Sequence, residues 1–252
     1  MDHPNVHFKA VGNYPPGSVR AKWVADSRPR VPQIEAAIEA VWKEASRRLK
    51  LFDGPICRLE SFQAGSTLDI NLSITSYKIF FGTNLANSQF AKLYGPATLA
   101  NGIGVSSIVL SRDGFILMGR RSESVAQYPL RAHTFGGTLE PHDPLDVFAE
   151  ARRELIEELG IDDRDIESIA CIGLVEDTTL HQPELIFAAR IGRSVAQLEQ
   201  SLDPREHESL IKIPAQPGPL AAALQDRALT PVGGAALMLL ERSGLVDRSS
   251  QL

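Results

Sequence analysis

The chain gathers its acidic side chains most densely in one short segment, Arg153-Glu154-Leu155-Ile156-Glu157-Glu158-Leu159-Gly160-Ile161. At about 100° per residue, Glu150, Glu154, Glu157 and Glu158 share one face of a helix whose opposite face is apolar. Like charges one turn apart destabilise a helix, and the single arginine in the segment cannot neutralise four acids. Hard divalent cations bind carboxylate oxygens. The pattern therefore favours a metal site over its alternative, a solvated charged face.

The residues around this segment predict where the helix begins and ends. Asp143 is the expected N-cap, Pro144 the first helical residue and Asp146 an acid at the third position. Gly160 suits the end of the helix. Upstream, Gly136-Gly137 has no side chains, so its backbone can approach a ligand closely. With the carboxylates, this glycine pair predicts a metal-assisted hydrolase.

Residues 137–161 resemble the signature of the Nudix hydrolases, G-x5-E-x7-R-E-U-x-E-E-x-G-U, in which U is an aliphatic residue. The second half of the signature matches at every fixed position. The first half is two residues longer here, so Asp143 or Asp146 stands where the signature has its first glutamate. Because that glutamate orients the signature arginine in the family, Asp146 is expected to pair with Arg153.

The resemblance also implies a cofactor and catalytic residues. Magnesium, with manganese or another divalent cation as alternatives, is expected on four ligands: Glu154, Glu157, Glu158 and the backbone carbonyl of Gly136. Glu154 and Glu158 are then expected catalytic residues, and Glu158 is the first candidate for the general base. A cation lowers the pKa of its own ligands, so a carboxylate further away also suits a base. Glu184 and Glu208 are the candidates for that role.

Residues 51–59 and 75–84 resemble the N-terminal part of a Nudix branch that includes UDP-glucose/UDP-galactose pyrophosphatases. The branch directs attention to six residues as contacts for uracil or the hexose: Thr75, Ser76, Tyr77, Gly82, Thr83 and Asn84. The alternative for this segment is an ordinary strand-to-helix turn. Arg120 and Arg121 are candidates for binding the diphosphate, because a guanidinium makes bidentate contacts with phosphate. Their alternative is a solvated strand end.

Hydrophobic periodicity predicts a mixed α/β (α+β) fold in two parts. Residues 1–96 are expected to form an N-terminal α+β domain that packs on a catalytic domain of residues 97–252. Strands and helices alternate without a regular parallel repeat, which favours a mixed sheet between helical layers; the resemblance implies the same α/β/α sandwich. The predicted strands are 6–10, 19–25, 56–62, 68–74, 105–110, 115–118, 169–175 and 185–191. The predicted helices are 32–49, 77–85, 144–159, 219–224 and 231–242.

Composition restricts the class of protein and its partners. The 252 residues are 43% hydrophobic, which is enough for a sizeable core. A net charge of −5 argues against binding to a nucleic-acid backbone. Cys57 and Cys171 predict neither a disulfide framework nor a zinc site. No apolar run reaches membrane-spanning length and no secretory signal is evident, so we expect no membrane partner and a cytoplasmic location.

These observations predict a magnesium-dependent enzyme that hydrolyses a small nucleotide sugar, UDP-glucose or UDP-galactose, to UMP and a sugar 1-phosphate. One alternative is a Nudix hydrolase for another nucleoside diphosphate, such as ADP-ribose. Another is a Nudix module that senses a nucleotide without hydrolysing it. The full set of helix carboxylates argues against the sensor, because an empty charged site destabilises a protein without serving it.

Overall fold

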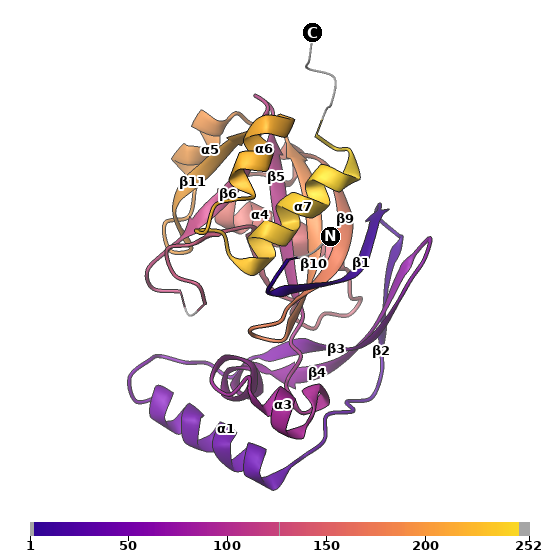
Figure 1. Cartoon of the computed structure of the whole chain (residues 1–252), viewed down its shortest axis with the longest axis vertical. Coiled ribbons are helices and arrows are strands. Elements are labelled where there is room, and N and C mark those ends of the chain that lie inside the picture. Colours follow the sequence, from indigo (N-terminus) through magenta and orange to yellow (C-terminus); the bar gives the residue numbers. More distant parts are fainter. Residues whose placement is uncertain (1–2, 126, 247–252) are drawn as a thin grey trace.

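The computed structural model describes residues 3–125 and 127–246, which form two β-sheets with helices around them (Figure 1). The large sheet has the strand order β1-β9-β10-β5-β6-β11, with β7 paired to β6 and β8 paired to β5. Its strands are β1 (Val6–Tyr14), β5 (Gly104–Ser111), β6 (Phe115–Arg121), β7 (Ala132–His133), β8 (Phe135–Thr138), β9 (Ile166–Asp177), β10 (Gln182–Ile191) and β11 (His207–Pro214). Strands β5 and β10 are parallel, whereas the other pairs are antiparallel. The predicted mixed sheet is therefore confirmed.

Helices cover both faces of the large sheet. They are α4 (Val147–Leu159), α5 (Val195–Ser201), α6 (Pro217–Ala223) and α7 (Pro231–Ser243). Side chains of β5 alternate between two cores: Val105 and Val109 pack with α4 and α5, whereas Ile108 and Leu110 pack with α6 and α7. In Figure 1, α7 lies in front of this sheet and α4 behind it. This arrangement is the predicted α/β/α sandwich.

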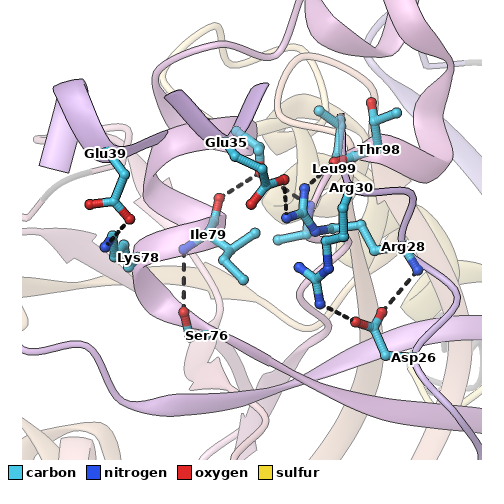
Figure 2. A network of polar contacts seen from close by, with 12 residues as sticks. Asp26, Arg28, Arg30, Glu35, Glu39, Ser76, Lys78, Ile79, Thr98 and Leu99 are labelled. Carbon is cyan, nitrogen blue, oxygen red and sulfur yellow. Dashed lines mark hydrogen bonds and ion pairs between the residues drawn. The ribbon is translucent and has the colours of Figure 1, made fainter. Parts of the chain in front are cut away.

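The small sheet belongs to the N-terminal part of the chain and has the order β2-β4-β3. Its elements are β2 (Val19–Trp23), β3 (Pro55–Ala64), β4 (Leu68–Ser76), α1 (Pro32–Ala45), α2 (Tyr77–Phe80), the π-helical turn η1 (Phe81–Leu85) and α3 (Phe90–Tyr94). Helix α1 ends before the predicted residue 49. Polar contacts hold α1 in place (Figure 2): Arg28 donates to the Glu35 carboxylate at 2.5 Å and to the Thr98 carbonyl at 3.1 Å, and Lys78 pairs with Glu39.

Backbone hydrogen bonds join the two parts of the chain. Strand β1 pairs with β9 along the edge of the large sheet. Strand β3 bonds to the segment before β5, where the Leu59 amide donates to Asn101 and the Ile103 amide donates to Cys57, both at 3.0 Å. The division into residues 1–96 and 97–252 stays a prediction, and β1 crosses it. Within the described ranges, no helix is long and apolar enough to cross a membrane.

Candidate active site

Helix α4 carries the acidic segment, and its start differs from the prediction. Asp146, not Asp143, is the N-cap: its side chain accepts hydrogen bonds from the amides of Phe148 at 2.9 Å and Ala149 at 3.2 Å. The helix therefore begins at Val147, with Val147 and Phe148 already in the core. Gly160 ends the helix in the left-handed conformation, with φ of 60°, as predicted.

Arg153 is bound by glutamates of its own helix. Its guanidinium donates to Glu150 at 2.6 and 3.2 Å, to Glu154 at 2.6 Å and to Glu157 at 2.7 Å. The predicted pairing of Arg153 with Asp146 is wrong, because the Asp146 carboxylate caps the helix instead. Glu150 takes the role instead: it is buried and lies one turn before Arg153, so its charge requires a partner close by.

The three predicted carboxylate ligands differ in exposure. The side chain of Glu157 is 58% exposed, that of Glu154 13% and that of Glu158 7%. Burial raises the pKa of Glu154 to about 7, against the favourable charge of Arg153. All three line a cavity of about 420 Å³, here called the carboxylate cavity. Its other lining residues are Gly136, Gly137, Asp203, Arg205 and Glu206.

Glu158 is held from two sides. Nε2 of His207 lies 2.9 Å from its Oε2, and the amide of Gly136 donates to both carboxylate oxygens at 3.2 and 3.3 Å. Burial raises its pKa, although the His207 contact and the Gly136 amide oppose that shift. Gly136 has a φ of 154°, and a Cβ there would lie 1.9 Å from the Val105 carbonyl oxygen. Only glycine allows β8 to run so close to β5.

A second cavity of about 380 Å³ adjoins the first and shares Gly136, Gly137 and Glu206 with it. We call it the arginine cavity, because Arg121 lines it. The other lining residues are Tyr77, Val125, Gln127, His133, Thr138, Gln182 and Glu184. Arg120, the preceding residue, is bonded to the Leu130 carbonyl at 3.0 Å and is not among the described lining residues. Neighbouring residues of a strand point to opposite faces, so the structure brings only one of the two predicted arginines into the cavity.

Glu184 is the predicted distant base that the structure places in the arginine cavity. It accepts a hydrogen bond from Ser106, and Nε2 of His133 lies 3.9 Å away. Burial raises the pKa of Glu184 to about 7. Burial, together with the charge of Arg121, holds the pKa of His133 well below its ordinary value. Glu208 is exposed and is not among the described residues that line either cavity.

Most of the predicted sugar and base contacts lie outside these cavities. Tyr77 lines the arginine cavity, and Ser76 caps α2 with a bond from the Ile79 amide. Thr75 is buried on β4. Thr83 and Asn84 are fully buried: both accept from the Ala100 amide at 3.1 Å, and the Asn84 amide donates to Leu180 and His181.

Gly82 has a packing role in the same turn. A Cβ on it would lie 2.9 Å from Cα of Ile38, so its missing side chain lets η1 pack on α1. We predicted that Gly82, Thr83 and Asn84 contact the substrate. Their packing and hydrogen bonds favour a structural role instead.

Several polar residues at the site were not predicted. Among them are Glu206 and Gln182, which line the cavities, and His207, which lies behind Glu158 and bonds to it. His207 and Glu206 come from β11 and the residue before it, and neither strand β11 nor helix α5 was predicted. The buried residues of β11 are His207, Leu210 and Ile213, which recur every three positions rather than every two, and the register shifts between His207 and Ser209. The sequence of this strand therefore lacks a regular alternation. A single histidine that bonds to a carboxylate distant in the sequence has no characteristic spacing.

The donor atoms suit a hard divalent cation. Apart from Arg205, every charged side chain of the carboxylate cavity offers carboxylate oxygens, the donors that magnesium and manganese prefer. In this structure the guanidinium of Arg153 bridges Glu154 and Glu157 and supplies part of the positive charge that their carboxylates need. Within the described residues, no three acidic, histidine or cysteine side chains are already gathered as a metal cluster. The residues fit the cation by chemistry, because Arg153 bonds to one oxygen of Glu154 and one of Glu157, and each carboxylate has a second oxygen to offer.

Known proteins resemble this chain over the same region. The model of the NUDIX domain matches residues 100–222. The uridine diphosphate glucose pyrophosphatase NUDT22 of Homo sapiens is 37% identical over 134 residues, which are 46% of this chain and 43% of the human protein. The Bos taurus protein of that name is 27% identical over 238 residues, 77% of this chain and 82% of the bovine one. The chain thus spans less than half of the human relative's length.

Solved structures also resemble the chain. The MutT protein of Methanosarcina mazei Go1 has 20% sequence identity and a TM-score of 0.42, covering 57% of this chain and 94% of that one. A mutT/nudix family protein from Listeria innocua has 19% identity and a TM-score of 0.41, covering 57% and 93%. The domain match therefore identifies residues 100–222 as a NUDIX domain, and the curated relatives that the chain resembles are uridine diphosphate glucose pyrophosphatases.

Proposed function

We propose that this chain hydrolyses the diphosphate of a nucleotide sugar, UDP-glucose or UDP-galactose, to UMP and a sugar 1-phosphate. The observation that supports the proposal best is the continuity of the two cavities. Carboxylates that suit a cation line one of them, and Arg121 and Tyr77 line the other, with Gly136, Gly137 and Glu206 shared between them. A diphosphate at this junction would place its charges between the cation and a guanidinium. The names of the NUDT22 relatives agree with the proposed substrate.

Magnesium is the proposed cofactor, with manganese as an alternative, and Glu154, Glu157 and Glu158 would hold it. When bound, such a cation neutralises phosphate charge and makes water a better nucleophile. Glu158 is already oriented toward the carboxylate cavity by the amide of Gly136, and Gly137 leaves room for Glu154, whose Oε1 would lie 2.6 Å from a Cβ there. These contacts prepare the oxygens for a ligand before it arrives.

The remaining residues supply binding and proton transfer. Arg121 would bind the diphosphate oxygens through its two terminal guanidinium nitrogens, since its Nε is bonded to the Gln127 carbonyl at 2.9 Å. Tyr77 and Gln182 offer an aromatic ring and an amide to the sugar or the base. Glu184, with a pKa of about 7, is the proposed base. It would take the proton of the attacking water as the new phosphorus–oxygen bond forms, and the leaving phosphate would depart with the electrons of the broken bond.

Product analysis tests the proposal. We would incubate the protein and its Glu158→Gln variant with magnesium and UDP-glucose, UDP-galactose or ADP-ribose, and separate the products by chromatography. We expect UMP and a sugar 1-phosphate from the wild type, and their loss in the variant and with EDTA. Cleavage of ADP-ribose alone would contradict the substrate. Calorimetric binding of a nucleotide sugar with no metal-dependent product would support a sensing module instead.

Arg121 and Arg120 form a matched pair for the second part of the test. Arg121→Leu should raise KM for the nucleotide sugar about tenfold or more, because a hydrogen bond to a charged group contributes about 1.5–3 kcal/mol. Arg120→Leu removes the same charge from the neighbouring position and should change KM little. Equal effects of the two variants would show that only the overall charge of the strand end matters.

A further inference from the structure

The imidazole of His207 is buried next to Glu158 and has a defined contact on each side. The ring is 2% exposed, its Nε2 lies 2.9 Å from Oε2 of Glu158, and it packs edge-on against Phe135 with ring centres 5.1 Å apart. Nδ1 is buried and has no hydrogen-bond partner among the described residues. When Glu158 is ionised its carboxylate can only accept, so this contact then requires the proton on Nε2 and the ring donates to Glu158.

The place of the ring depends on a glycine of another strand. A Cβ at Gly119 on β6 would lie 2.1 Å from Nδ1 of His207 and 2.5 Å from its Cε1. Cβ atoms do not approach other atoms so closely, so any side chain at Gly119 would displace the ring. Gly119 has no positive φ to explain it. Its use here is the space that it leaves for the imidazole.

The main chain before His207 is also tied to Glu158. The amide of Asp203 donates to the Glu158 carbonyl at 2.8 Å, and the His207 amide donates to the Asp203 carbonyl at 3.1 Å. The ring and the carboxylate therefore belong to one hydrogen-bonded unit that links the end of α4 to the start of β11. A free glutamate side chain has three rotatable bonds, whereas this one is fixed by contacts from β8 and β11.

We propose that His207 is a positioning residue: seated by Gly119, it fixes the carboxylate of Glu158 so that the oxygens face the carboxylate cavity, ready for a divalent cation. The inference rests on the proposed metal-dependent function. Groups that hydrogen-bond to a metal ligand orient it, and their loss weakens metal affinity or activity by about 10- to 100-fold. A plain core histidine would instead contribute only packing against Phe135.

Metal binding without nucleotide tests this inference separately from the substrate. We would titrate the protein with Mn²⁺ and measure the free ion by electron paramagnetic resonance. His207→Leu should weaken Mn²⁺ binding about tenfold or more, whereas His207→Gln, whose amide can donate from the position of Nε2, should recover most of the affinity. In assays at saturating Mn²⁺, the Leu variant should recover activity, and its KM for the nucleotide sugar should stay near that of the wild type.

Gly119 supplies an independent route and a matched control. Gly119→Ala should weaken Mn²⁺ binding without altering any acidic residue, because it displaces the ring. Gly173→Ala introduces a similar clash on β9, with the Cβ 2.7 Å from the Ala10 carbonyl oxygen and outside the described lining of both cavities. It should lower the melting temperature and leave Mn²⁺ affinity unchanged.

Two results would overturn the inference. One is a folded His207→Leu or Gly119→Ala variant with wild-type Mn²⁺ affinity, and the other is an equal loss of affinity in Gly173→Ala. A wild-type protein that binds no Mn²⁺ would contradict the proposed metal dependence as well. Failure to cleave UDP-sugars, with Mn²⁺ binding that depends on His207, would contradict only the substrate.

Discussion

At the scale of single residues, burial raises the pKa of three carboxyl groups although a basic side chain lies near each of them. The pKa of Glu154 and that of Glu184 are each raised to about 7, and that of Glu158 is raised as well, with burial the largest cause in every case. Such shifts cluster at functional sites, because a site that binds a cation or moves a proton keeps carboxylates out of water. The two cavities thus combine a place for positive charge with a group that can exchange a proton near neutral pH.

Glu184→Gln tests which carboxylate acts as the base. We expect kcat to fall about 100-fold or more, the usual contribution of a general base. Wild-type kcat should rise with pH through about 7, because the base acts only when deprotonated, and the variant should lose this rise. Glu208→Gln, on exposed β11, should keep both kcat and the pH profile. If Glu184→Gln retains the rise through pH 7, the base lies elsewhere.

The same substitution also has a consequence for stability. The pKa of Glu184 is higher in the folded protein than in the unfolded chain, so its contribution is favourable at low pH and is lost as pH rises through about 7. Glu184→Gln removes this loss. From pH 5 to pH 8, the free energy of unfolding of the variant minus that of the wild type should increase by on the order of 2 kcal/mol. Urea unfolding at each pH measures both values.

The sequence reveals the chemical type and the spacing of residues, but it does not directly reveal their burial or their long-range partners. The type and spacing of Glu154, Glu157 and Glu158 were enough to place them together, because one helix carries all three. Asn84 has the right chemistry for a substrate contact, but its type does not reveal that it is fully buried. His207 bonds to a residue 49 positions earlier in the chain, a distance at which no local pattern pairs two side chains.

At the scale of elements, regular periodicity predicted the long helices and the paired strands of both sheets. The elements that were missed are short or irregular: β8 contains Gly136-Gly137, which weakens a strand pattern, and β11 is bulged. The start of α4 was placed too early because Asp143-Pro144 has the residue types of an N-cap and first turn. Only the side-chain bonds of Asp146 distinguish the true cap.

Turn η1 tests the structural role assigned to Asn84. Asn84→Ala removes two donated bonds, to the carbonyls of Leu180 and His181, and two accepted bonds, from the Ala100 amide and the Thr83 hydroxyl. The Ala100 amide is buried and the bonds to Leu180 and His181 are partly buried, so we expect a loss of about 3 kcal/mol in the free energy of unfolding, with KM for the nucleotide sugar unchanged in the folded fraction. Asn87→Ala is the control, because Asn87 donates only to the Gly82 carbonyl and is partly exposed. A raised KM with unchanged stability would restore the original prediction for Asn84.

At the scale of the whole molecule, contacts between residues far apart in the sequence join the two parts of the chain, and no local sequence pattern reveals them. Strand β1 lies at one end of the sequence and pairs with β9, more than 150 residues later. Side chains of the small sheet, such as Leu68 and Ile70, share a core with Val105 of β5 and Leu155 of α4. The predicted boundary after residue 96 marks a change of elements along the chain, while the core continues across it. We therefore expect the two parts to unfold together.

Tyr14 on β1 provides the test of this cooperativity. Both tryptophans, Trp23 and Trp42, lie in the first 96 residues, so their fluorescence reports the N-terminal part, while circular dichroism at 222 nm also reports α4 and α7. In urea, both signals should change in one transition with the same midpoint. Tyr14→Ala, which empties a site that is 3% exposed, should lower both midpoints together, with a loss of about 3 kcal/mol. Val11→Ala, on the same strand at 37% exposure, should shift them much less. Separate midpoints for fluorescence and circular dichroism would instead show two domains that fold independently.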